Sequence, residues 1–122
     1  MRELNNVLLD SNKNKSFCLV ESMGKLEKIK TDDVLYIVAD GRYTEIVTIA
    51  GTIFCNRSLG KWIKEENNLI LLQTHRSYLV PIAKIKCLEK GIVTLDSGEK
   101  IPVSRRMYTH VEEEYRKYFM LR

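Results

Sequence analysis

Short β-type runs separated by glycine-centred turns constrain the fold of this chain more than any other feature of its sequence. Runs rich in Val, Ile, Thr, Tyr and Phe recur between dipeptides such as Asp40-Gly41 and Ser97-Gly98. Such dipeptides favour the tight turns of β-hairpins, and several runs alternate apolar and polar residues as half-buried strands do. The expected strands lie at 17–21, 26–30, 34–39, 43–49, 52–56, 84–89, 92–95 and 99–103, with two further short runs on either side of His75 and Arg76.

Two stretches have helical periodicity. The first places Leu59, Trp62 and Ile63 on one face, with Ser58 as its N-cap. The second begins at Ser104, whose hydroxyl is expected to cap it. We therefore expect a mainly β fold of about ten short, mostly antiparallel strands in an elongated sheet or sandwich arrangement, with one mid-chain and one C-terminal helix. The apolar face of the second helix comprises Met107, Tyr108, Val111, Tyr115 and either Tyr118 or Phe119.

Length and composition indicate one folded domain. The chain has 122 residues, of which 44% are hydrophobic and 30% are charged, enough for a core without disulfides or metals. Residues 1–15 show no sustained period, so we expect a linker or residual N-terminal segment there and the domain over residues 16–122. The sequence contains neither a run of roughly 20 apolar residues that could span a bilayer nor a signal-peptide segment, which predicts a cytoplasmic protein.

Metal and cofactor sites are not indicated by the sequence. Cys18, Cys55 and Cys87 are odd in number and widely spaced, so we interpret them as reduced, buried thiols. There is no C-x-x-C pair, and His75 and His110 lie too far apart to suggest shared metal ligands. We therefore expect no metal and no cofactor.

The net charge of +4 permits a polyanionic partner, so the positions of the charges matter more than their sum. Three strand connections, termed the three tips, contain four arginines and one aspartate, a net +3 in 15 residues with histidine neutral. If the tips converge, they form a cationic edge, and arginine suits it because its planar fork donates paired hydrogen bonds to guanine or phosphate. The tips are residues 39–43 with Arg42, residues 74–78 with Arg76, and residues 102–106 with Arg105 and Arg106.

The first two tips also have a purely structural interpretation. Arg42 could be a solvated charge in a turn, and Arg76 could pair with a carboxylate such as Asp40. His75 is flanked by alternating apolar residues, which favours a structural histidine over a catalytic base. The sequence leaves these alternatives open.

Ser104, Arg105 and Arg106 are expected to open the second helix. The Ser104 hydroxyl is explained as a cap, although the free N–H groups of a helix start also attract phosphate. Cations in a first helical turn oppose the helix dipole, at a cost of roughly a few tenths of a kcal/mol each. This unfavourable placement of two arginines indicates that they have a function.

Four motifs, in a fixed order, resemble one known family. They are DDVLYIVADGRYTEIVT, SLGKWI, HRSYLVPIAKI and GEKIPVSRR. Over roughly residues 16–118 the chain is similar to the LytTR family, the DNA-binding output domain of LytR/AlgR-type response regulators. The resemblance implies a bacterial two-component system and a predominantly β domain whose loops enter successive major grooves of promoter DNA.

The resemblance also implies contact residues and partners. The family joins two copies on adjacent DNA repeats through a receiver domain, which implies a homodimer on repeated sites. Residues 1–15 are too few for a receiver, so the chain is either part of a longer regulator or a free-standing one. The first contact loop is implied to contain Arg42, Tyr43 and Thr44, with Arg42 favoured as a base or phosphate contact. The second contact is implied to be Arg76 together with His75. The third is implied to be Arg106, which would read a base, with Ser104 and Arg105 near the DNA backbone.

The expected function is therefore sequence-specific binding of double-stranded DNA as the output domain of a bacterial transcriptional regulator. The alternative is a β-rich interaction or sensing module that binds an anionic peptide or small molecule. An enzyme is not expected, because the chain contains no G-x-S-x-G, H-E-x-x-H or P-loop motif.

Overall fold

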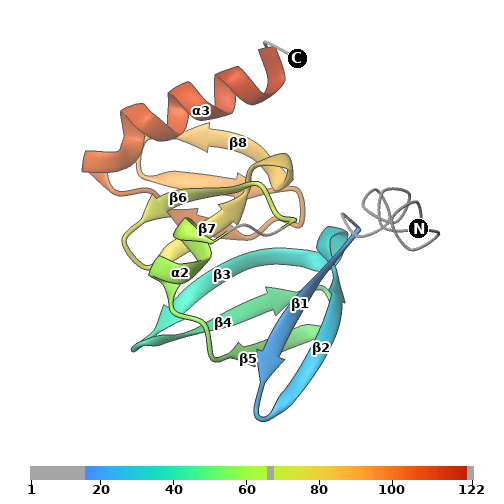
Figure 1. The fold of residues 1–122 in the computed structure, drawn as a ribbon. Coiled ribbons are helices and arrows are strands. Elements are labelled where there is room, and N and C mark those ends of the chain that lie inside the picture. The colour runs from blue at the N-terminus through green and yellow to red at the C-terminus, as the bar shows by residue number, and fades with distance from the viewer. Residues whose placement is uncertain (1–15, 66–67, 121–122) are drawn as a thin grey trace, which may run out of the picture.

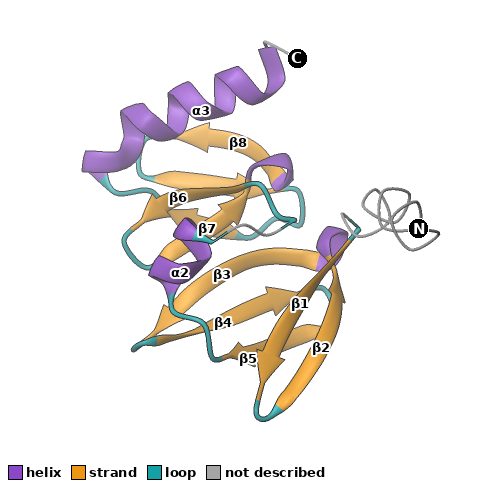
Figure 2. Ribbon diagram, in the orientation of Figure 1, coloured by secondary structure: helices purple, strands orange, loops and turns teal. Residues whose placement is uncertain are grey.

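The computed structural model describes residues 16–65 and 68–120, so the linker expected at residues 1–15 lies outside the described residues. In the described ranges the chain forms ten strands, two α-helices and three 3-10 turns (Figures 1 and 2). The expected mainly β fold, with one mid-chain and one C-terminal helix, is confirmed. The strands are β1 (Phe17–Ser22), β2 (Lys25–Lys30), β3 (Val34–Asp40), β4 (Tyr43–Thr48), β5 (Gly51–Cys55), β6 (Leu71–His75), β7 (Tyr78–Pro81), β8 (Ile85–Glu89), β9 (Ile92–Leu95) and β10 (Lys100–Pro102). The helices are α2 (Leu59–Lys64) and α3 (Tyr108–Met120), and the 3-10 turns are η1 (Thr31–Asp33), η2 (Ile82–Lys84) and η3 (Arg105–Met107).

The described strands form three antiparallel sheets. The central sheet has the order β5-β4-β3-β7-β6, beside a two-stranded β1-β2 sheet and a three-stranded β10-β9-β8 sheet. The pairing of β3 with β7 is antiparallel and joins Ile37 to Leu79 and Val38 to Tyr78. This pairing places the β3-β4 hairpin beside the β6-β7 hairpin, although the two hairpins are distant in the sequence.

The central sheet contributes to a core on each of its two faces, β3, β6 and β7 to both cores and β4 and β5 to the first alone. A first core, which includes Val20, Ile37 and Trp62, joins it to the β1-β2 hairpin and α2. A second core, which includes Val93 and Val111, joins it to β8, β9, β10 and α3. Consecutive side chains of a strand point to opposite faces, and neighbouring residues of β7 accordingly belong to different cores, Leu79 to the first and Val80 to the second.

The two helices differ in detail from the sequence expectation. Of the three residues expected on one face of α2, Leu59 and Trp62 are buried, whereas the Ile63 side chain is 51% exposed. The C-terminal helix begins as the 3-10 turn η3 and becomes α-helical at Tyr108. Its buried side is centred on Val111, and Phe119 is exposed. Among the described residues, no helix is long and apolar enough to cross a membrane.

The cysteines are three free thiols in two environments. Cys18 and Cys55 are buried as predicted, but the prediction for Cys87 was wrong because this residue is exposed. A register shift between Ile85 and Cys87 interrupts the alternation of β8. The bulge turns Cys87 away from the face that buries Ile85.

Candidate nucleic-acid interface

The first tip is a two-residue β-turn. Asp40 pairs with Tyr43 at the end of the β3-β4 ladder, so Gly41 and Arg42 alone form the turn. Gly41 has a φ of 63°, a backbone conformation that favours glycine and suits hairpin turns. Tyr43 packs against Phe54 of β5 with ring centroids 5.3 Å apart. The short turn and the contact between Tyr43 and Phe54 therefore restrict the position of the exposed Arg42.

The second tip is braced by its own histidine. The Nδ1 atom of His75 accepts a hydrogen bond from the backbone N–H of Ser77 at 3.1 Å. The His75 ring also meets Tyr78 edge-on, with centroids 5.7 Å apart. These contacts support the structural interpretation of His75, and they hold the turn from which the exposed Arg76 projects.

The third tip leads from β10 into α3. The backbone N–H of Val103 donates to the carbonyl oxygen of Gly91 at 2.9 Å, which fixes the chain as it leaves β10. Arg105 and Arg106 are exposed and lie in η3, the turn immediately before α3. They therefore occupy the first turn of the C-terminal helical segment, as expected, but this turn is a 3-10 turn that precedes the α-helical part.

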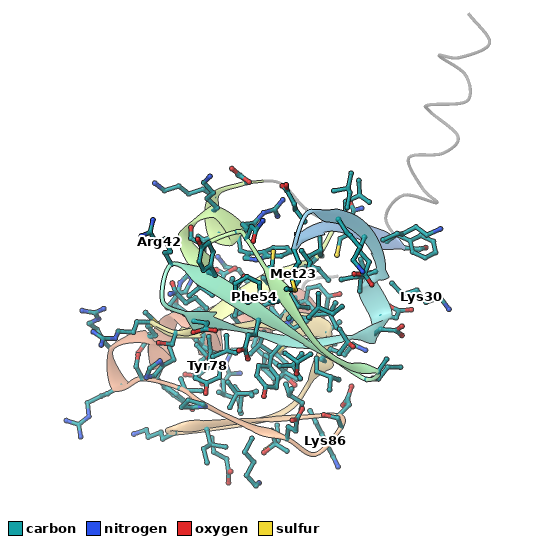
Figure 3. The ribbon with its side chains drawn as sticks, turned by 90° about the horizontal axis from the view of Figure 1, so that it is seen from below. Met23, Lys30, Arg42, Phe54, Tyr78 and Lys86 are labelled. Carbon is teal, nitrogen blue, oxygen red and sulfur yellow. The ribbon has the colours of Figure 1, made fainter. Side chains whose placement is uncertain are left out.

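Two backbone hydrogen bonds join the three tips. The N–H of Ala39 in the first tip donates to the carbonyl oxygen of Ser77 in the second at 2.8 Å. The N–H of Ser104 in the third tip donates to the carbonyl oxygen of Thr74 in the second, also at 2.8 Å. The three connections consequently lie along one side of the molecule, to the left of the view in Figure 1. Seen from below, Arg42 and Tyr78 lie on the same side, opposite Lys30 (Figure 3).

The arginines of the tips carry uncompensated charge. The four guanidinium groups are exposed, and within residues 16–65 and 68–120 none of them forms a salt bridge. The possible pairing of Arg76 with Asp40 is not formed. Surface ion pairs occur elsewhere, for example Arg116 with Glu112 at 2.9 Å. An unpaired guanidinium keeps all its donors for an external anion.

Thr44 does not lie on the surface of the first tip. It is completely buried, and its Oγ1 accepts a hydrogen bond from Nε1 of Trp62 at 3.0 Å. The same hydroxyl donates to the carbonyl oxygen of Arg57 at 2.7 Å. Both hydrogen-bonding functions of the Thr44 hydroxyl are therefore used inside the protein.

The Ser104 hydroxyl does not cap a helix, so that prediction was wrong. Ser104 precedes η3, but its side chain makes no capping hydrogen bond. Its Oγ atom and the Oγ1 atom of Thr74 are the two buried side-chain atoms without a hydrogen-bond partner among the described residues. The third tip is held by the backbone N–H of Ser104 instead.

The contacts that organise the edge include residues which the sequence interpretation missed. Thr74 and Ser77 act through backbone carbonyl groups, which every residue has, so no residue type could have revealed them. Trp62 offered a signal, because a tryptophan on an amphipathic helix usually needs a partner for its N–H group. The identity of that partner, Thr44, depended on the pairing of β4 with β5.

Comparisons with known proteins agree with this architecture. The family model described as the LytTr DNA-binding domain matches residues 24–116. The CO-responsive transcriptional regulator RcoM of Rhodospirillum rubrum is 30% identical over 91 residues, which cover 70% of this chain and 39% of RcoM. A solved LytTr DNA-binding domain from Bacillus cereus has the same fold, with a TM-score of 0.62 and 20% identity over 82% of this chain and 95% of that one. Since the family model spans most of the sequence, the chain belongs to the LytTr DNA-binding domain family.

Proposed function

We propose that this domain binds double-stranded promoter DNA in a sequence-specific manner through the three tips, as the output domain of a bacterial transcriptional regulator. The observation that carries the proposal is the joining of the three arginine-bearing tips by the hydrogen bonds Ala39–Ser77 and Ser104–Thr74. The family supports DNA as the partner. A role at promoters would place the protein in the cytoplasm.

The exposed arginines have distinct roles in this proposal. Arg106 reads a base, since a bidentate arginine–guanine contact discriminates against other bases by about 1–3 kcal/mol. Arg42 and Arg76 contact phosphate or a base from hairpin turns, and Arg105 contacts the DNA backbone. Tyr43, 39% exposed beside Arg42, is available for a phosphate contact through its hydroxyl. His75 braces the turn of Arg76, so we assign it a supporting role.

Hairpin tips suit the major groove. The groove of B-DNA is about 12 Å wide and admits a two-stranded β-ribbon. The tips follow one another along the edge in the order 39–43, 74–78 and 102–106, because each neighbouring pair shares a backbone hydrogen bond. An edge that presents several tips in a row can enter successive grooves, whereas a single recognition helix reads one.

The proposal extends to the complete regulator. The matching region spans 39% of the length of RcoM, so most of that relative lies outside it. A receiver domain N-terminal to this domain, together with a homodimer on repeated sites, would make the second binding event intramolecular. Linkage of this kind can raise avidity by a factor on the order of 100 without new contacts.

Selection of duplexes from a random-sequence pool tests the proposed function. The protein should enrich a defined sequence, bind it more tightly than a scrambled duplex, and lose affinity steeply as salt rises. Failure to enrich any sequence would contradict the proposal. Weak salt dependence with preferential binding of an anionic peptide or small molecule would favour the alternative function.

A further inference from the structure

We propose that Thr44 is a positioning residue for DNA binding: its buried hydroxyl, held between Trp62 and Arg57, sets the orientation of the first tip. Helix α2 would thereby influence DNA affinity through the core of the domain. The proposal rests on the proposed function of Arg42 as a DNA contact.

The Thr44 hydroxyl acts as both acceptor and donor. It accepts from the indole N–H of Trp62 at 3.0 Å and donates to the carbonyl oxygen of Arg57 at 2.7 Å. These two bonds tie the first residues of β4 to α2 and to the segment that leads into it. Serine could reproduce both bonds, whereas valine has nearly the same shape as threonine and can make neither.

The partners of Thr44 are themselves fixed. Trp62 is 2% exposed and packs in the first core. The guanidinium of Arg57 lies over the Trp62 ring, 4.4 Å from its centroid, and also meets Glu65 at 3.7 Å. The helix that carries Trp62 begins at a cap in which the Ser58 hydroxyl accepts from the N–H of Lys61 at 3.2 Å. The hydroxyl is therefore held by a rigid neighbourhood.

The connection from Thr44 to the tip is short. Thr44 pairs with Ala39 on one side and with Cys55 on the other. Only Tyr43 separates Thr44 from Arg42, and the two-residue turn leaves little freedom between them. Ala39 is also the residue whose N–H reaches the second tip. A shift of Thr44 would consequently move Arg42 and disturb the junction between two tips.

The same strand supplies a matched control. Thr48, 7% exposed, lies at the other end of β4, where its hydroxyl donates to the carbonyl oxygen of Gly51 at 2.7 Å and accepts from the N–H of Ala50 at 3.1 Å. It is therefore a second buried threonine with the same number of hydrogen bonds, far from the tips. Thr44→Val and Thr48→Val should reduce thermal stability to a similar degree.

The test compares the affinities of folded variants for the duplex that the wild-type protein selects. Thr44→Val should weaken binding by about five- to tenfold, because contact groups need placement within about 0.5 Å, and Thr44→Ser should restore affinity to within about twofold. In an Arg42→Ala background, Thr44→Val should cause almost no further loss, whereas in an Arg106→Ala background its effect should persist. Equal losses in Thr44→Val and Thr48→Val, or full additivity with Arg42→Ala, would overturn the proposal.

A measurement on the free protein separates this inference from the proposed function. Amide hydrogen exchange at Tyr43 and Thr44, which lie in the ladder beside the first tip, should accelerate in Thr44→Val and in Trp62→Phe, which lacks the indole donor, but not in Thr48→Val. Unchanged exchange in both Thr44→Val and Trp62→Phe would refute the proposal that the Thr44 hydroxyl orients the first tip, even if one of these variants were too unstable for the binding assay. If the variants show accelerated exchange but the wild-type protein fails to select DNA, the proposed function and the role of Thr44 in DNA binding would both be contradicted. The structural connection from the Thr44 hydroxyl to the first tip would still be supported.

Discussion

The backbone N–H of Ser104 donates to the carbonyl oxygen of Thr74 at 2.8 Å, and this bond attaches the start of the C-terminal helical segment to the edge strand of the central sheet. Arg105 and Arg106 follow Ser104 directly, while Arg76 lies two residues beyond Thr74. A single backbone contact thus sets the spacing of arginines from two distant parts of the chain.

Arg106→Ala should relax sequence preference while leaving the fold intact. The side chain is exposed and forms no salt bridge among the described residues, so its removal should have little effect on stability. Loss of one bidentate base contact should lower discrimination at one position by about 1–3 kcal/mol. Gel-shift assays with the selected duplex and its single-base variants measure this effect. Arg116→Ala, on the exposed side of α3, is the control, and unchanged discrimination in Arg106→Ala would reject the assignment.

Arg42→Ala should weaken binding of all duplexes to a similar degree if this residue contacts phosphate. The slope of log affinity against log salt concentration should then become shallower by about one unit. Lys30→Ala, which removes an exposed cation on the opposite side of the molecule (Figure 3), should leave the slope unchanged. A slope equal to that of the wild type in Arg42→Ala would exclude the phosphate role.

His75→Ala should loosen the second tip. The substitution removes the 3.1 Å hydrogen bond from Ser77 and the edge contact with Tyr78. One neutral hydrogen bond contributes about 0.5–1.5 kcal/mol, so denaturant unfolding should show a loss of this order. DNA affinity should fall together with stability, and loss of affinity with unaltered stability and tip dynamics would instead indicate a direct contact.

Thr74→Val should stabilise the free domain. The Thr74 side chain is completely buried, and its hydroxyl has no partner among the described residues. Since a buried unsatisfied polar group costs about 1–3 kcal/mol, an apolar isostere should raise the free energy of unfolding. Thermal and urea unfolding test this directly, and a clear destabilisation would show that the hydroxyl binds a buried water molecule or another group.

Cys87 should react with thiol reagents far faster than the other two cysteines. Cys18 and Cys55 are buried, and burial raises the pKa of the Cys18 thiol, an effect that Arg57 only partly offsets. Because the thiolate is the reactive form, Cys18 should react only after unfolding. Titration with a chromogenic disulfide should therefore show one fast thiol in the native protein and three in denaturant, and Cys87→Ser should abolish the fast phase.

The strands were predictable from the sequence because glycine and alternation are local signals. Gly41 and Gly98 adopt positive φ at the turns where they were expected, and Ser58 caps α2. Thr44 is more instructive. The alternation of residues 43–49 places Thr44 on the same face as the core residue Ile46, whereas the family resemblance implies a contact role. The local pattern was the better guide to its burial.

The remaining differences depended on tertiary structure. Cys87 faces outward because a bulge follows Ile85, and no glycine or proline marks that bulge in the sequence. Ser104 has the residue type and position of a cap, yet its hydroxyl is buried and its backbone N–H is bonded to β6, a neighbour that sequence periodicity cannot identify. The convergence of the tips likewise required the pairing of β3 with β7.

The burial of β3, β6 and β7 of the central sheet between two cores has a consequence for recognition. Two of the tips extend directly from strands of this sheet, and the third is bonded to its edge, so the spacing of the arginines cannot easily adapt to a target. In the proposed complex, most of the conformational change on binding would then occur in the DNA. Promoters whose base steps bend or twist readily should bind best, even at positions that no side chain touches.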